Sequence, residues 1–117
     1  MPTPRAGLLQ RLATAALLAA LLVLGVQPVL ADSGAQLFEN HCAGCHAGGG
    51  NIIRRGKTLR LEALRRYDLA SPQAIAAVAA AGRGQMSGYR EQLGGDAGVQ
   101  AVADWVWQQA QSGWKRP

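Results

Sequence analysis

The chain has 117 residues, with twelve Lys and Arg against seven Asp and Glu and only two cysteines. These totals combine two unlike parts, because residues 1–31 are typical of an export signal. Arg5 and Arg11 flank a short polar start, Leu12 to Val26 is an apolar run of fifteen residues, and Val29 to Ala31 precedes a cleavage point. Fifteen residues fall short of the roughly 18 that cross a bilayer, which argues against a permanent anchor. We therefore expect a cleaved signal peptide over 1–31 and one mature domain over 32–117.

The 86 residues of the mature part are too few for two domains. Without Arg5 and Arg11, ten Lys and Arg stand against seven Asp and Glu, an excess too small for a general nucleic-acid binder. Thirteen glycines and six aromatic residues give this part a thin core. Chains of this size often need a covalent or metal staple.

The two cysteines stand in the sequence Cys42-Ala43-Gly44-Cys45-His46, which has the spacing of covalent haem attachment. Two thiols on one turn can each add to a vinyl group of the haem, and the imidazole that follows can then reach the iron. The motif predicts one haem c, bound through Cys42 and Cys45, with His46 as an axial iron ligand. The haem would then be the staple that the thin core needs.

Three other interpretations of the cysteines are weaker. A thioredoxin-type redox pair expects a βαβ unit, whereas Ile52-Ile53 is nearly the whole strand signal of the chain. A zinc site needs four converging ligands, but the candidates His41, Cys42, Cys45 and His46 are packed into six residues. A disulfide across two intervening residues closes a very small loop and stabilises little.

The second axial position of the haem iron distinguishes two classes of protein. An electron carrier has a ligand there, whereas an enzyme or sensor leaves the position open. After export the chain keeps one methionine, Met86, in the glycine-rich stretch 82–89. Glycines let the backbone wrap closely around a flat cofactor, so we expect Met86 to be the second ligand rather than a core filler. Lys57 and Lys115 are outside possibilities without a comparable loop, and His41 is held on the attachment side by its neighbour Cys42.

The rest of the sequence predicts an all-α domain of about four helices around the haem. The expected helices cover 34–41 after a cap at Asp32-Ser33, 58–66 from a cap at Thr58, 72–81 between Ser71 and Gly82, and 99–110. In the second of these, Leu61 and Leu64 should point inward. In the last one, the inward positions are Val99, Val102, Val106 and Ala110. Trp105 and Trp107 lie about 200° apart on that helix, so only one of them can face the core fully.

The order of these features resembles the class I cytochromes c, and the residues are most similar to cytochrome c6. The resemblance covers 34–114 and rests on Gly34 to Phe38, Cys42 to His46, Gly48 to Asn51, Lys57 to Leu59, Glu62 to Leu64 and Gly113-Trp114. It implies the class I cytochrome c fold, with the first helix packed across the last through Gly34, Phe38, Val102 and Trp105.

The resemblance also implies a function. Proteins of this family are soluble one-electron carriers of the thylakoid lumen or periplasm, not enzymes, and take electrons from cytochrome f of the b6f complex for photosystem I. The chain would be a monomer that meets these membrane complexes transiently, with no nucleic-acid partner. A haem-based sensor or peroxidase subunit is the alternative from another class, but the sequence offers no distal histidine and no acid-base pair.

Two residues around Met86 depart from the family pattern. Ser87 stands where cytochrome c6 usually has proline, and Ala80 stands where it usually has glutamine. Low-potential c6-like paralogues replace that glutamine with an aliphatic residue. The departures favour a second interpretation, in which a low-potential c6-like cytochrome serves another acceptor such as a terminal oxidase.

A run of positive charge follows the haem motif. Arg54, Arg55, Lys57, Arg60, Arg65 and Arg66 place six cations in thirteen positions, with Glu62 as the one acidic residue among them. The run is either an ordinary solvated face or a surface that steers the protein to an acidic partner.

Overall fold

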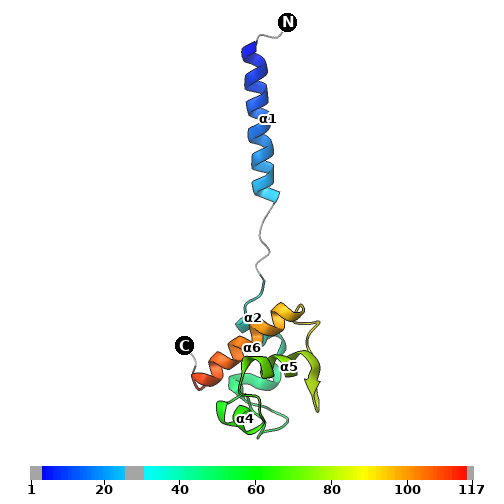
Figure 1. The fold of residues 1–117 in the computed structure, drawn as a ribbon, viewed down its shortest axis with the longest axis vertical. Coiled ribbons are helices and arrows are strands. Elements are labelled where there is room, and N and C mark those ends of the chain that lie inside the picture. The colour runs from blue at the N-terminus through cyan, green and yellow to red at the C-terminus, as the bar shows by residue number, and fades with distance from the viewer. Residues whose placement is uncertain (1–3, 26–30, 116–117) are drawn as a thin grey trace. The chain divides into compact units, whose positions relative to one another are not determined.

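The computed structural model describes residues 4–25 and 31–115, which belong to two compact units, 1–31 and 32–117 (Figure 1). The described residues of the first unit form one helix, α1 (Pro4–Gly25), which contains all but the last residue of the predicted apolar run. No helix in the described ranges is both long and apolar enough to cross a membrane. Val29 and Leu30 lie outside the described residues, and cleavage after Ala31 stays a prediction.

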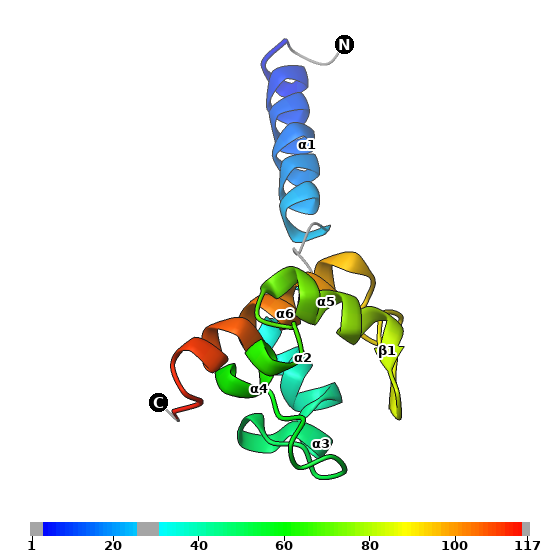
Figure 2. The same ribbon diagram turned by 60° about the horizontal axis from the view of Figure 1, so that its bottom comes forward.

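The second unit is helical, as predicted, and Figure 2 shows α2 and α5 against α6, with the β1 hairpin at one side of the unit. Its elements are α2 (Gly34–His41), α3 (Ala43–His46), the 3-10 helix η1 (Ala47–Gly49), α4 (Leu61–Arg66), α5 (Pro72–Ala81), β1 (Gly82–Arg83), β2 (Met86–Ser87) and α6 (Asp96–Gln111). Among the described residues, β1 and β2 form the one sheet, a two-stranded antiparallel hairpin in which Arg83 pairs with Met86. The predicted all-α architecture is confirmed.

Two of the predicted helices begin and end where the sequence indicated. The Ser33 side chain accepts a hydrogen bond of 3.2 Å from the Gln36 amide, and the Gln36 side chain accepts one of 2.8 Å from the Ser33 amide. This reciprocal capping box fixes the start of α2. Ser71 caps α5 through the Ala74 amide at 3.1 Å, and Gly82 ends it with a left-handed φ of 79°.

The other two helices differ from the prediction at their N-termini. The Thr58 hydroxyl accepts from the Arg60 amide at 3.3 Å, two residues away, which makes a turn instead of a helix cap. As a result α4 begins only at Leu61. In contrast, α6 begins three residues early, at Asp96, because Gly95 turns the chain with a φ of 92° and Asp96 places a carboxylate in the first turn of the helix. Ile52 and Ile53, the expected strand signal, lie in a bend and are exposed.

The core lies where α2 and α5 pack on α6. The four inward positions predicted in α6 are all buried, with exposed fractions of 5% or less. Leu64 of α4 is also buried, but Leu61 is only half-buried, and Ala63 is the second buried residue of that helix.

Helix α2 crosses α6 through a position that admits only glycine. A Cβ on Gly34 would collide with the Ala101 carbonyl oxygen and come within 2.8 Å of the Trp105 Cβ. The Phe38 ring packs on the Trp105 indole with a centroid distance of 4.7 Å. The crossing expected from the family resemblance is therefore present. Trp105 and Trp107 are both half-buried, so neither faces the core fully.

Candidate haem-binding site

The three residues of the predicted attachment motif share one helical turn. Cys42 ends α2 and precedes α3, and its carbonyl oxygen accepts hydrogen bonds from the Cys45 amide at 3.2 Å and the His46 amide at 3.0 Å. Both thiols and the imidazole therefore lie within five consecutive residues, Cys42 and the four residues of α3. This is the close grouping that attachment to two neighbouring haem vinyl groups requires.

The His46 ring is oriented by a backbone carbonyl. His46 Nδ1 lies 2.7 Å from the Gly50 carbonyl oxygen. Because a carbonyl oxygen can only accept, Nδ1 carries the proton, and Nε2 of the neutral ring keeps its lone pair for a metal. Metal-ligating histidines characteristically make this kind of second hydrogen bond, which fixes the tautomer and the ring plane. The Gly50 carbonyl was not predicted as a site group, since a backbone acceptor leaves no signal in the sequence.

The two thiols differ in their surroundings. Cys42 is half-buried, and burial raises the pKa of its thiol to about 11, so it is neutral at physiological pH. Cys45 is exposed, and neither cysteine is in a disulfide. The disulfide interpretation therefore fails in this structure.

The other two alternative interpretations fail as well. Within the described residues no three His, Cys, Asp or Glu side chains converge as metal ligands, so His41, Cys42, Cys45 and His46 do not form a zinc site. A thioredoxin-type βαβ unit is absent from the same ranges, where the one sheet is the hairpin of β1 and β2. What remains is a pair of free thiols beside an imidazole with a free Nε2, which fits a covalently attached haem.

The Met86 segment is folded tightly against the end of α5. A Cβ on Gly82 would lie 2.5 Å from the Met86 carbonyl oxygen, and a Cβ on Gly88 would collide with the Ala80 carbonyl oxygen. The Tyr89 amide donates a hydrogen bond of 2.8 Å to the Ala79 carbonyl oxygen. Met86 itself is half-buried in β2. The glycines thus allow the close backbone approach that the sequence predicted, although as a hairpin and not as an open loop.

The structure shows where Ala80 lies on α5. The side chains of Ala76, Ala79 and Ala80 are partly buried and pack against the hydrophobic core. Val78 is half-buried but is not among the described residues that pack on this core. Residues 78 and 80 lie about 160° apart around α5. The Val78 carbonyl also accepts the capping hydrogen bond of Gly82, at the base of the hairpin. A side chain at 78 therefore lies on another face of α5 than a side chain at 80 and is not packed on the core.

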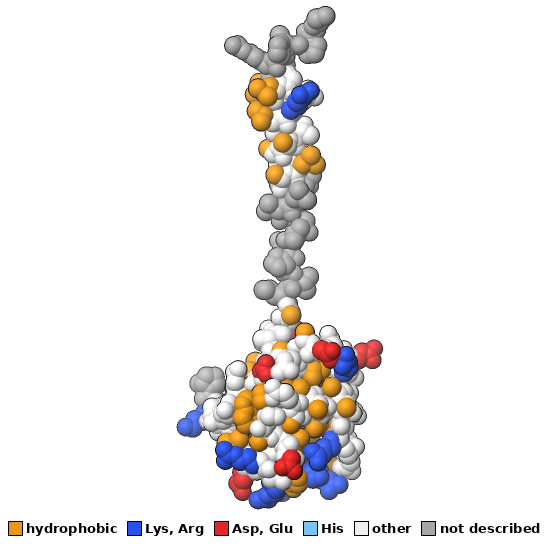
Figure 3. All heavy atoms as spheres, in the orientation of Figure 1, with side chains coloured by type: hydrophobic (Ala, Val, Ile, Leu, Met, Phe, Trp, Pro, Cys, Tyr) orange, Lys and Arg blue, Asp and Glu red, His pale blue; other side chains and the backbone are white. Residues whose placement is uncertain are grey.

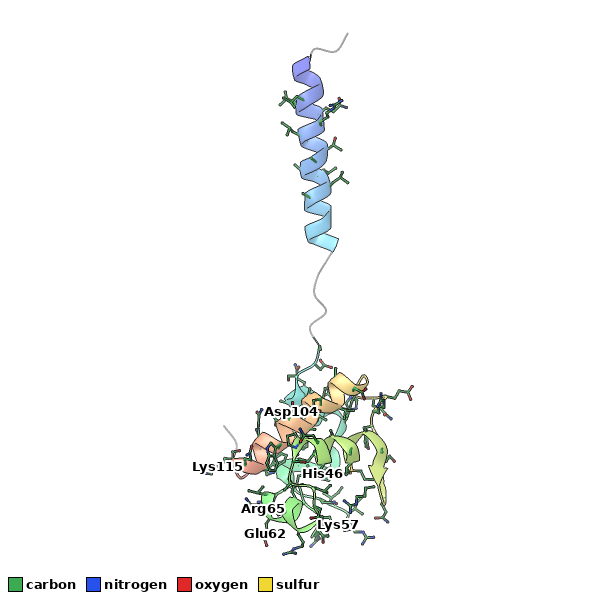
Figure 4. All side chains as sticks on the ribbon, viewed as in Figure 1. His46, Lys57, Glu62, Arg65, Asp104 and Lys115 are labelled. Carbon is green, nitrogen blue, oxygen red and sulfur yellow. The ribbon has the colours of Figure 1, made fainter. Side chains whose placement is uncertain are left out.

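The other three candidate iron ligands, Lys57, Lys115 and His41, are not held in a glycine-rich hairpin. The Lys57 ammonium is 5.4 Å from the centroid of the Tyr67 ring, in a cation–π contact. Lys115 is exposed beyond the end of α6, and His41 is half-buried in the last turn of α2. Figure 4 shows Lys115 at one side of the unit, away from Lys57 and His46. None of the three is presented by a folded-back glycine segment like the one that carries Met86.

Asn51 is a structural residue of the site whose role the sequence did not reveal. Its Oδ1 accepts hydrogen bonds from the Ile53 amide at 3.0 Å and the Arg54 amide at 2.8 Å, and its Nδ2 donates to the Lys57 carbonyl at 2.9 Å. The loop 51–57 is joined to the attachment turn, because the Ile52 amide donates to the Cys45 carbonyl at 3.1 Å. An Asn between glycines and an apolar pair is a recognisable turn signal, but not one that shows which amides it binds.

Comparisons with known proteins agree with this geometry. The family described as cytochrome c oxidase, cbb3-type, subunit III matches residues 29–106. A cytochrome c6-like protein of Nostoc sp. is 45% identical over 71% of this chain and 74% of its own length. Cytochrome c6 of Aphanizomenon flos-aquae is 44% identical over 72% of this chain and 95% of its own length.

Solved structures give the same result for the fold. Cytochrome c6B from Synechococcus sp. WH8102 superposes with a TM-score of 0.69 at 56% identity, over 72% of this chain and 94% of that one. Cytochrome c6C from Synechococcus sp. PCC 7002 has a TM-score of 0.66 at 48% identity, over 69% and 98%.

A single-domain helical fold with paired thiols and an oriented imidazole on one turn defines a c-type cytochrome, which carries one covalently bound haem c. Such a protein transfers electrons and is not an enzyme. The identity and coverage narrow the class further: the chain belongs to the cytochrome c6 family, which includes the c6-like proteins.

Proposed function

We propose that Cys42 and Cys45 attach the haem and that His46 and Met86 are its axial iron ligands. The observation that carries this proposal is the hydrogen bond from His46 Nδ1 to the Gly50 carbonyl, because it leaves Nε2 as the available nitrogen on the turn that holds both thiols. Met86 is supported by its position in a folded-back hairpin and by being the one methionine after residue 31. The haem supplies a one-electron Fe(II)/Fe(III) couple when it is bound.

The protein residues have three tasks in this function. The hydrogen bond that His46 Nδ1 donates to the Gly50 carbonyl oxygen keeps the imidazole in one orientation. The hairpin positions Met86, whose thioether would occupy the second axial position and so leave no open site for a substrate. The packed core of α2, α5 and α6 excludes water from the interior of the domain. One electron enters and one leaves, without any bond to carbon, oxygen or hydrogen being made or broken.

The partners follow from the family. We infer that the protein is exported to the thylakoid lumen or the periplasm and exchanges electrons with membrane complexes. The cytochrome b6f complex would be the donor and photosystem I the acceptor. This is supported by the identity to proteins named cytochrome c6 and by the export-type sequence of 1–31.

A second candidate has a specific observation in its favour. A low-potential c6-like cytochrome would serve another acceptor, such as a terminal oxidase. It is supported by Ser87, by the aliphatic residues Val78 and Ala80 in the helix before the Met86 hairpin, and by 56% identity to the cytochrome c6B structure.

One experiment separates the two candidates. The holoprotein is titrated potentiometrically, and its reduction by the b6f complex is measured in the same buffer. A photosystem I donor must have a potential at or above that of cytochrome f, whereas a low-potential carrier lies below it. Each 59 mV of difference changes the equilibrium constant of the one-electron transfer about tenfold.

A further inference from the structure

The carbonyl that orients the His46 ring lies in a run of three glycines, the most flexible kind of backbone. Gly48 and Gly49 have left-handed φ values of 62° and 78°. Gly50 is extended, with a φ of −81° and a ψ of −168°, and its carbonyl oxygen lies 2.7 Å from His46 Nδ1. Glycine loses more conformational freedom on folding than any other residue. The position of the Gly50 carbonyl therefore depends on contacts from elsewhere in the fold.

Gly49, directly before that residue, is held by the side chain of Trp114. It is buried, and a Cβ placed on it would meet three atoms of the Trp114 indole at 2.5–2.6 Å. The indole Nε1 donates a hydrogen bond of 2.9 Å to the Leu59 carbonyl oxygen. The Leu59 amide in turn donates one of 2.8 Å to the Gly49 carbonyl oxygen. Trp114 and Leu59 thus hold Gly49 by its α-carbon and by its carbonyl group, and we call this pair the C-terminal clamp.

The backbone of Trp114 adopts a conformation that tryptophan rarely takes. Helix α6 ends in a Schellman motif, in which the Gly113 amide donates to the Ala110 carbonyl at 3.3 Å and the Trp114 amide donates to the Gln109 carbonyl at 2.9 Å. This motif needs a left-handed residue at Gly113, whose φ is 75°, but Trp114 is left-handed as well, with a φ of 57°. Such a conformation is strained in a residue other than glycine and persists only where other contacts hold it. The contacts of the indole over Gly49 must therefore outweigh this strain.

On its other side the glycine run is followed by a loop that cannot cover it. Asn51 binds backbone groups of residues 53, 54 and 57, and so fixes the loop itself. Residues 52–57 are all exposed, and Figure 3 shows Lys and Arg side chains along the lower edge of the unit. An exposed loop does not shield a neighbouring backbone from water. The apolar cover on the glycine run is the indole of Trp114.

We propose that Trp114 is a positioning residue for His46. It holds Gly49, and through Gly49 the adjacent Gly50 carbonyl, where that carbonyl fixes the imidazole. This inference rests on the proposed role of His46 as an axial ligand and adds a residue from the C-terminal end of the chain that keeps this ligand in orientation. The partner of the second ring nitrogen sets the tautomer and the plane of a metal-ligating histidine, and losing that partner weakens the site. Without the indole, the Gly50 carbonyl should move away from Nδ1 more often and leave the Nδ1 proton open to solvent.

The test measures hydrogen–deuterium exchange of the His46 Nδ1 proton by NMR in the reduced, ¹⁵N-labelled holoprotein. The Val102 amide, in the buried part of α6, is the reference for opening of the whole domain in the same samples. In Trp114→Ala we expect the ratio of the Nδ1 rate to the Val102 rate to rise about tenfold or more, because the loss is local to the clamp. Trp114→Phe keeps a ring over Gly49 and should restore most of the protection.

Two further variants complete the test. Trp107→Ala is the matched control, because it removes another half-buried indole at the C-terminal half of α6, and it should leave the ratio unchanged. Trp114→Leu fills part of the space without a flat ring or a donor, and it serves if the alanine variant does not fold. Its ratio should rise by about threefold or more.

Two results would overturn this inference while leaving the proposed function in place. One is a ratio that stays at the wild-type value in Trp114→Ala and Trp114→Leu, including equal acceleration at both protons, since the indole would then only stabilise the domain. The other is the same rise of the ratio in Trp107→Ala. The ligand assignment is tested separately in the wild type. If the haem is attached but does not shift the His46 ring signals, the ligand assignment is wrong, and this inference falls with it.

Discussion

The indole Nε1 of Trp114 donates a hydrogen bond of 2.9 Å to the Leu59 carbonyl oxygen, across 55 residues of sequence. The same indole covers Gly49, where a Cβ would lie 2.5 Å from the ring, and it packs on Phe38 with a centroid distance of 5.5 Å. The C-terminal end of the chain thereby closes over the segment between the haem motif and α4. One side chain thus contacts α2, the glycine-rich segment after the haem motif and the loop before α4.

We expect Trp114→Phe to lower the free energy of unfolding by about 1–2 kcal/mol. Phenylalanine keeps most of the ring packing but removes the donor, so the Leu59 carbonyl loses its partner in a half-buried position. The measurement is urea denaturation of the holoprotein, with Trp107→Phe as the control, because Trp107 is half-buried on α6 without such a bond in the described structure. Equal losses in both variants would show that ring size, and not the hydrogen bond, determines the effect.

Met86→Ala should leave the haem covalently attached but change its electronic properties. Attachment requires only the two thiols, whereas thioether ligation favours Fe(II), so its loss should lower the reduction potential and open one coordination position. The measurements are the absorption spectrum, the midpoint potential and binding of imidazole to the oxidised protein. Lys57→Ala is the control, since that lysine was the alternative ligand and should be dispensable. If the absorption spectrum were unchanged in Met86→Ala but altered in Lys57→Ala, Lys57 and not Met86 would be the second axial ligand.

Asn51→Ala should loosen the loop 51–57 without unfolding the domain. The substitution removes one acceptor shared by two amides and one donor to the Lys57 carbonyl. Because the loop is exposed, we expect a cost of roughly 1–2 kcal/mol and faster hydrogen exchange at the Ile53 and Arg54 amides. Exchange at the core amides of α6 should stay slow. The control variant Asn40→Ala should leave the exchange rates as they are in the wild type, including those of the loop. Equally fast exchange in the wild type would mean that Asn51 does not fix the loop.

The sequence predicted those parts of the fold that depend on local chemistry. Ser33 and Ser71 followed by helix-forming residues, and Gly82 after an alanine-rich run, determine helix ends with little influence from the rest of the protein. The start of α4 could not be predicted, because a Thr can cap a helix or close a turn, and only the backbone that follows Thr58 decides between them. The early start of α6 depends on the left-handed conformation of Gly95, which glycine permits but does not require.

For some residues of the candidate site the sequence predicted the position, but it did not predict how the side chain is oriented. Spacing alone placed Cys42, Cys45 and His46 on one turn, because an i to i+4 segment closes locally. The orientation of the His46 ring comes from the Gly50 carbonyl, and backbone acceptors carry no residue identity. The setting of Ala80 could not be predicted for a similar reason: counting residues back from Met86 fixes a distance along the chain, but the face of α5 on which a residue lies is set by the packing of this helix on α6.

The last prediction concerns the residue beside the Met86 hairpin that sets the potential. Val78 is half-buried at the base of the hairpin and off the core, whereas Ala80 packs into the core on nearly the opposite face of α5. A glutamine amide at 78 could hydrogen-bond toward the ligand region, and hydrogen bonding around the ligands is one of the levers that tune a haem potential. We expect Val78→Gln to raise the potential by some tens of mV, where 59 mV is a tenfold change in equilibrium constant. Ala80→Gln should instead destabilise the protein, because it buries an amide against apolar neighbours, and should leave the potential nearly unchanged. Potentiometric titration and thermal unfolding of the two variants measure both effects. A rise at position 80 with none at position 78 would restore the expectation drawn from the sequence and contradict the assignment made from the faces of α5.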